Sequence, residues 1–231
     1  EKTYALPFGK QQRVGEYTVT VSFLLREKTL WAEAGHEVAF GQYVYKVEGE
    51  EKAPVSGVEI VRSLHNIGVR GENFEVMFSV LNGGLVSYKY AGREMIEAIP
   101  KPNFWRAPTD NDCGNQMPMR YAQWKIASMY ASHKEFRRGM YGPSNAPETT
   151  VHDNSVEVAF TYIMPTTPVS ECRLAYEVFG DGRVKTTLTY DPVKELGDMP
   201  EFGVLFKFNA DYDHVKWYGL GPAETYADRK H

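Results

Sequence analysis

Ten residues near the middle of the chain bring together several groups that could do chemistry. The run from Asn103 to Asp112 reads Asn-Phe-Trp-Arg-Ala-Pro-Thr-Asp-Asn-Asp. Its two aromatic rings offer stacking faces, and the guanidinium of Arg106 offers a fork of hydrogen-bond donors. The side chains of Asp110, Asn111 and Asp112 offer acceptors. Such a set suits either a polyhydroxylated ligand or a buried polar network.

The residue types alone favour the structural alternative. Phe104-Trp105 is typical of a core strand, and Asp110-Asn111 is typical of the turn that ends it. Asp110 and Asp112 lie too close in sequence to face each other across a substrate unless a turn splays them. We therefore expect Arg106 to be substantially buried and hydrogen-bonded to Asp110 or Asp112, since a buried charge requires a partner.

Metal and thiol chemistry find little support in the sequence. Asp110-Asn111-Asp112 followed by Gly114 resembles part of a calcium loop, but the full spacing and the closing glutamate are absent. The six histidines are scattered without ligand spacing. Cys113 and Cys172 are too few and too far apart for a disulfide framework, so we expect two free, partly buried thiols. We assign no metal and no cofactor to this chain.

The elements that must position these residues are mostly strands. Alternating apolar and polar residues, or short apolar runs between turn signals, predict strands over 17–23, 40–47, 74–80, 85–90, 156–163, 172–179, 184–190, 202–208 and 214–218. Met119–Tyr130, with Pro118 in the first turn, is the single substantial helix that we expect, with Tyr121 and Trp124 turned inward. Many antiparallel strands with one helix favour a large two-sheet sandwich.

The length and net charge of the chain limit the classes of protein to which it can belong. A chain of 231 residues is long enough for one large β domain or two smaller ones. The net charge of −4 gives no reason to expect a nucleic acid or an anionic membrane as partner. Residues 48–54 are charged and without period, which predicts a linker. The chain begins without methionine and ends directly after a motif, so we expect a piece of a longer polypeptide.

Three segments resemble one family. The run 103–112 resembles a signature of the C-terminal domain of bacterial β-galactosidases of glycoside hydrolase family 2. Residues 217–229 resemble a second signature of that domain, Gly-Leu-Gly-Pro-x-Glu-x-Tyr-x-Asp-Arg. Residues 31–39 resemble the end of the immunoglobulin-like domain that precedes it. The three segments follow the family order and are spread over nearly the whole chain.

The resemblance implies two domains. Residues 1–50 would be the last strands of an immunoglobulin-like linker domain, because a complete one takes about 100 residues. Residues 51–231 would form most of a supersandwich, a large antiparallel β-sandwich related to galactose mutarotases, truncated at its end. Sheet edges would then be unprotected. We expect either self-association through these edges or disorder of the N-terminal segment, with better order from about residue 65 to 218.

The implied parent enzyme hydrolyses terminal β-D-galactosides with retention. Such enzymes need two carboxyls about 5 to 5.5 Å apart. Glu33 and Glu37 fit a solvated pair, and Glu224 with Asp228, on a loop rich in glycine and proline, is harder to dismiss. In the family, however, the catalytic glutamates come from a (β/α)₈ barrel that precedes both domains. We therefore expect no catalytic residue, and no activity, in this chain.

The resemblance also suggests what the chain contacts. Arg106, Asp110, Asn111 and Asp112 would support the wall of the substrate pocket as a scaffold. The implied partners are the catalytic barrel and other domains of the parent, its β-galactoside substrate, and further copies in a homo-oligomer. Any Mg²⁺, Na⁺ or Ca²⁺ that the parent uses would bind at the barrel. The compartment, bacterial cytoplasm or periplasm, stays open.

Two alternatives belong to other classes of function. A stand-alone carbohydrate-binding module would use Trp and Tyr side chains and would present two or more solvent-facing rings in one groove. The inference of an aldose mutarotase would depend on fold analogy alone, and such an enzyme would require a histidine and a carboxylate that converge in a cleft.

Overall fold

The computed structural model describes residues 3, 5, 9–49, 57–133, 147–217 and 219. By its internal contacts the chain divides into two compact units, residues 1–53 and 54–231. Each unit is described by itself below.

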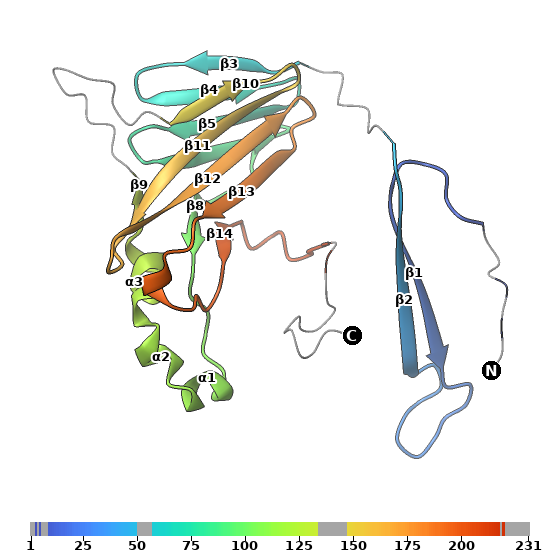
Figure 1. The fold of residues 1–231 in the computed structure, drawn as a ribbon. Helices are drawn as coiled ribbons and strands as arrows, with labels where there is room; N and C mark the ends of the chain where they lie inside the picture. The colour runs from blue at the N-terminus through green and yellow to red at the C-terminus, as the bar shows by residue number, and fades with distance from the viewer. Residues whose placement is uncertain are drawn as a thin grey trace. The chain divides into compact units, whose positions relative to one another are not determined.

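The first unit contains an antiparallel hairpin of β1 (Gly15–Leu24) and β2 (Glu37–Val47), which confirms the two expected strands (Figure 1). The register places Tyr17 opposite Tyr45 and Val19 opposite Tyr43, so one face of the hairpin is apolar. We expected these strands to be half-buried. Among the described residues of this unit no second layer covers this face, and Tyr43 is 68% exposed.

The second unit contains two antiparallel sheets. The first has the order β3-β4-β5-β6-β7, so each strand pairs with its neighbour in sequence. Its strands are β3 (Glu59–Arg62), β4 (Asn66–Arg70), β5 (Phe74–Ser79), β6 (Gly84–Tyr90) and β7 (Arg93–Glu94). Residues 80–83 connect β5 to β6, and Gly83 adopts a positive φ of 68° there, a conformation that glycine reaches without steric cost.

The other sheet has the order β10-β11-β12-β13, and the short β9 also pairs with β11. Its strands are β9 (Ser132–His133), β10 (Glu148–Val151), β11 (Ser155–Met164), β12 (Ser170–Phe179) and β13 (Val184–Tyr190). The long central strands bury residues on both faces, with Val158 and Tyr176 wholly buried. The expected strands over 156–163, 172–179 and 184–190 are confirmed.

The core of the second unit lies between the two sheets (Figure 1). Phe78 of β5 packs against Phe160 of β11 and Tyr176 of β12, with ring centroids 6.3 and 5.5 Å apart. This face-to-face packing of two antiparallel sheets confirms the predicted sandwich.

A third pair of strands and the helices adjoin the sandwich. β8 (Ala98–Asn103) pairs with β14 (Gly203–Lys207), and β8 also contacts β6 and α3. The helices are α1 (Asp110–Gly114), α2 (Met117–Arg120), α3 (Ala122–Tyr130) and the 3₁₀ turn η1 (Lys194–Leu196). Trp124 is buried as expected, whereas Tyr121 is only partly buried.

Several expectations need correction. The single helix expected over 119–130 is broken at Tyr121, whose φ of −117° is not helical. The turn expected at Asp110–Asp112 is the first part of helix α1. Residues 214–217 are not a strand, although they were predicted as one with residue 218, which lies outside the described residues. Cys113 is exposed rather than partly buried, while Cys172 is buried.

Candidate functional site

The candidate site forms where the chain leaves β8. The guanidinium of Arg106 donates to both carboxylate oxygens of Asp112, from Nη2 to Oδ1 over 2.9 Å and from Nη1 to Oδ2. Arg106 Nε also donates to the carbonyl oxygen of Pro200, 94 residues away, over 3.2 Å. The predicted pairing of Arg106 with a carboxylate is confirmed, and Asp112 is the partner. The Arg106 side chain is 27% exposed, so it is half-buried rather than deeply buried.

Thr109 locks Asp112 into this geometry. The Thr109 backbone N–H and hydroxyl both donate to Asp112 Oδ2, over 2.8 and 2.9 Å, and the Asp112 N–H returns a bond to the Thr109 oxygen. This reciprocal arrangement is a capping box at the start of α1. The hydrogen bond from Arg106, reinforced by the Thr109 N–H, holds the pKa of Asp112 well below its ordinary value.

The two rings of the run face the core. Phe104 is wholly buried, and its ring packs against Trp124 and Phe202 at 5.9 and 6.3 Å. Trp105 is partly buried against the same core, as expected for a structural residue rather than a sugar platform. Asn103 donates to the carbonyl oxygen of Trp105 over 2.8 Å. The run is therefore a junction that ties β8, α1 and the segment before β14 together.

The remaining site candidates are separated. Asp110 and Asn111 are exposed on α1. Among the described residues, no group of three His, Cys, Asp or Glu side chains could hold a metal ion. Glu33 is paired with Lys28 on an exposed loop. Glu224 and Asp228 lie outside the described residues.

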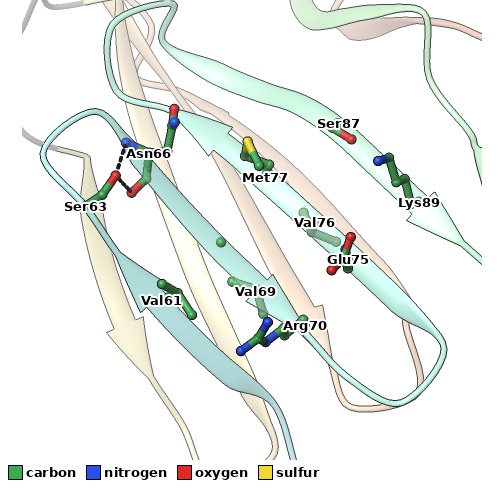
Figure 2. A pocket seen from close by; sticks show the side chains of 11 residues that line it. Val61, Ser63, Asn66, Val69, Arg70, Glu75, Val76, Met77, Ser87 and Lys89 are labelled. Carbon is green, nitrogen blue, oxygen red and sulfur yellow. Dashed lines mark hydrogen bonds between the residues drawn. The ribbon is translucent and has the colours of Figure 1, made fainter. Parts of the chain in front are cut away.

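A depression of about 260 Å³ lies on the outer face of the first sheet, across β3 to β6 (Figure 2). Strand register places Val61, Gly68, Met77 and Ser87 in one row across it. The neighbouring row alternates in charge and consists of Glu59, Arg70, Glu75, Lys89 and Glu94. In this row the Arg70 guanidinium donates to both carboxylate oxygens of Glu59, each over 3.0 Å. None of the described residues that line this depression is aromatic.

A second depression, of about 390 Å³, lies on the apolar face of the β1–β2 hairpin and is lined by Val19, Val21, Gly41, Gln42 and Tyr43. Among these described residues only Tyr43 has an aromatic ring. Two rings in one groove would favour a carbohydrate-binding module, and neither depression provides them. An aldose mutarotase would require a histidine and a carboxylate that converge in a cleft. His214 lies 2.5 Å from Asp213, but both side chains are largely exposed rather than set in a cleft. None of the described helices is long and apolar enough to cross a membrane.

The fold places the chain in the class of large antiparallel β-sandwiches. Comparison with known families identifies the family within this class. Residues 70–231 match the family described as beta galactosidase small chain, and residues 1–46 match the one described as beta-galactosidase, domain 4. The first match covers more than half of the chain, so the chain belongs to the β-galactosidase small-chain family. The resemblance seen in the three sequence segments is thereby confirmed.

Similar proteins are much longer than this chain. A β-galactosidase of Clostridium acetobutylicum is 37% identical over 231 residues, which is 99% of this chain and 24% of that protein. One of Halalkalibacterium halodurans is 40% identical over 93% of this chain and 21% of that protein. The β-galactosidase small subunit of Latilactobacillus sakei is 31% identical over 71% of this chain and 54% of that subunit. The chain thus spans about a quarter or less of the two longer relatives.

Proposed function

We propose that this chain is a non-catalytic part of a β-galactosidase that hydrolyses terminal β-D-galactosides with retention. The observation that carries this proposal is the match of residues 70–231 to the small-chain family, beside a domain-4 match over residues 1–46. The similar proteins of C. acetobutylicum and H. halodurans are named β-galactosidases and are about four times as long. The catalytic carboxylates would belong to the remainder of the parent, as would any Mg²⁺, Na⁺ or Ca²⁺.

The geometry of the run 103–112 supports a scaffold role for it. Arg106 and Asp112 bind each other bidentately, and Thr109 and Pro200 supply further partners. Groups that are already paired gain little from a ligand, because a ligand must first replace those bonds. The pair would hold α1 and the end of β8 in place, and α1 would then present Asp110 and Asn111 toward the parent or its substrate.

The L. sakei relative suggests how the chain works with its parent. There the matched part lies within a protein named as a small subunit, and the small-chain match in this chain starts only at residue 70. The second unit would therefore act as a self-contained body that completes the enzyme by docking onto the catalytic part. The first unit would belong to the domain that leads from the catalytic part to it.

An activity assay on the purified chain tests the non-catalytic role. With a chromogenic β-galactoside we expect no turnover above the buffer rate, because a glycosyl-enzyme intermediate needs a suitably spaced carboxylate pair. Turnover that disappears in Glu224→Gln or Asp228→Asn would show that this chain carries the catalytic groups itself. Saturable galactose binding by the chain that is lost on Tyr43→Ala would instead indicate a carbohydrate-binding module and count against this proposal.

A further inference from the structure

The loop that joins β1 to β2 presents two large apolar side chains to solvent. Leu30 is fully exposed, and its neighbour Trp31 is 67% exposed. We call these two residues the Leu30–Trp31 tip. Adjacent exposed apolar side chains mark interaction sites more often than isolated ones do. Tryptophan in particular is enriched among the residues that dominate binding energy.

The loop that carries this tip is held by its own hydrogen bonds. The Thr29 N–H donates to the Ala32 carbonyl over 2.9 Å, and the Ala32 N–H donates to the Thr29 hydroxyl over 3.2 Å. At the base of the loop, Leu25 N–H donates to the His36 carbonyl and Gly35 N–H to the Leu25 carbonyl, both over 2.8 Å. A loop that is already ordered loses little conformational entropy when it binds.

The surroundings of the tip have the layout of an interface. The indole of Trp31 rests edge-on against the His36 ring, with centroids 5.2 Å apart and an interplanar angle of 89°. Beside it, Lys28 and Glu33 form an exposed ion pair. An apolar centre with a polar, solvated rim is the usual organisation of a protein–protein contact.

The tip is separate from the apolar face of the hairpin. Leu24 and Glu37 form the last cross-strand pair, and the loop extends beyond them (Figure 1). A sheet that covers the face formed by Tyr17 and Tyr43 would lie alongside the strands and reach only the base of the loop. Covering Leu30 and Trp31 therefore requires a further surface.

The geometry points to one occupant for that surface, and this inference rests on the proposed function. We infer that the Leu30–Trp31 tip inserts into an apolar pocket on the catalytic part of the parent β-galactosidase. The similar enzyme of C. acetobutylicum has about three quarters of its length outside the region matched by this chain, so it offers a partner of the required size. The two side chains are anchors within a larger contact, since a stable interface buries about 1,200 Å² or more.

Hydroxyl-radical footprinting of Trp31 tests this inference. The measurement compares the free chain with a chimeric C. acetobutylicum β-galactosidase in which this chain replaces the matched region. We expect rapid oxidation of Trp31 in the free chain and a rate at least about fivefold lower in the chimera. A parallel sample mixes the free chain with the C. acetobutylicum enzyme truncated before that region, so the result does not depend on the solubility of the chimera.

A pair of variants adds a functional measurement. Leu30→Ala/Trp31→Ala should shorten the half-life of the chimera on heating by about tenfold, whereas it should leave the melting temperature of the free chain unchanged. Val169→Ala is the control, because Val169 is an equally exposed apolar loop residue, at 67%, in the second unit. The chimera that carries Val169→Ala should have the same half-life on heating as the unmodified chimera.

The outcomes separate the two proposals. Equal oxidation of Trp31 in the free chain, the chimera and the mixture would overturn the inference and leave the proposed function intact. Protection in the free chain that rises with concentration would also overturn it, since the occupant would then be a second copy of this chain. A chimera that protects Trp31 but hydrolyses no galactoside would keep the contact and count against the proposed function.

Discussion

At the scale of single residues, Arg106 and Asp112 connect segments far apart in the sequence. Arg106 joins Asp112, six residues later, to the carbonyl oxygen of Pro200, so one side chain links the exit of β8 to the segment before β14. The sequence predicted the pairing, because a half-buried guanidinium next to two aromatic residues requires a carboxylate. It could not predict the contact to Pro200, which depends on how the whole sandwich closes.

The first prediction concerns Asp112. Asp112→Asn should lower the melting temperature at pH 7 by about 2–4 °C, because it replaces a charge-assisted, bidentate pair with a neutral one. The folded-state pKa of Asp112 is depressed, so its stabilising effect is fully present above the ordinary value of 3.8 and is lost progressively as the pH falls from there through the depressed folded-state pKa. The gap between variant and wild type should therefore narrow in melts at pH 3. Asp110→Asn is the control, and an equal loss in both variants would contradict the account.

The second prediction contrasts two buried tyrosines. The Tyr162 hydroxyl donates to the Gly83 carbonyl oxygen, whereas the buried Tyr176 hydroxyl has no hydrogen-bond partner among the described residues. Tyr162→Phe should cost about 1–2 kcal/mol in the free energy of unfolding, because it leaves a buried carbonyl without its donor. Tyr176→Phe should be neutral or stabilising. Urea unfolding of both variants measures this, and a larger loss at Tyr176 would reveal a partner for its hydroxyl.

At the scale of elements, the strands that alternate clearly were predictable and the irregular ones were not. β8 contains Pro100 and Pro102, and proline is unusual within a sheet, so no strand was expected there. Gly68, in the middle of β4, weakened the pattern of that strand in the same way. Both strands form because their neighbours supply the pairing and the burial that the local sequence lacks.

The helices, like the strands, were only partly predictable from the local sequence. Asp110-Asn111-Asp112 is typical of a turn, and the signal for a helix was the Thr109-x-x-Asp112 spacing, an acidic variant of the capping box. The break at Tyr121 had no such signal. After the break, the side chain of Gln123 is held by a distant residue, because its amide donates to the Leu196 carbonyl over 2.8 Å.

The third prediction concerns the turn between β5 and β6. Gly83 and Gly92 both have positive φ, 68° and 79°, but a Cβ at Gly83 would overlap the His133 ring, whereas a Cβ at Gly92 would meet nothing within 4 Å. Gly92→Ala should cost about 1 kcal/mol for the backbone conformation alone. Gly83→Ala should cost at least about 1 kcal/mol more, because β9 must also move. Equal unfolding midpoints in urea would show that His133 does not pack on this turn.

At the scale of the whole molecule, both units leave apolar surface uncovered within the described residues. In the first unit this surface includes Val21 and Phe23, and in the second it includes Leu205 of β14 and the stacked rings of Phe206 and Phe208. Contiguous exposed apolar residues of this kind mark surfaces that another body covers. The proposed function accounts for them, because similar β-galactosidases have a long additional chain that could cover both.

The central claim is that this chain completes a β-galactosidase without catalysing the reaction. The most direct test is complementation in trans, with the C. acetobutylicum enzyme truncated before the region that this chain matches at 37% identity. We predict that the truncated enzyme and this chain each hydrolyse a chromogenic β-galactoside poorly or not at all, and that the mixture restores activity by about tenfold or more. Activity in this chain alone, or a truncated enzyme that is fully active without it, would contradict the account.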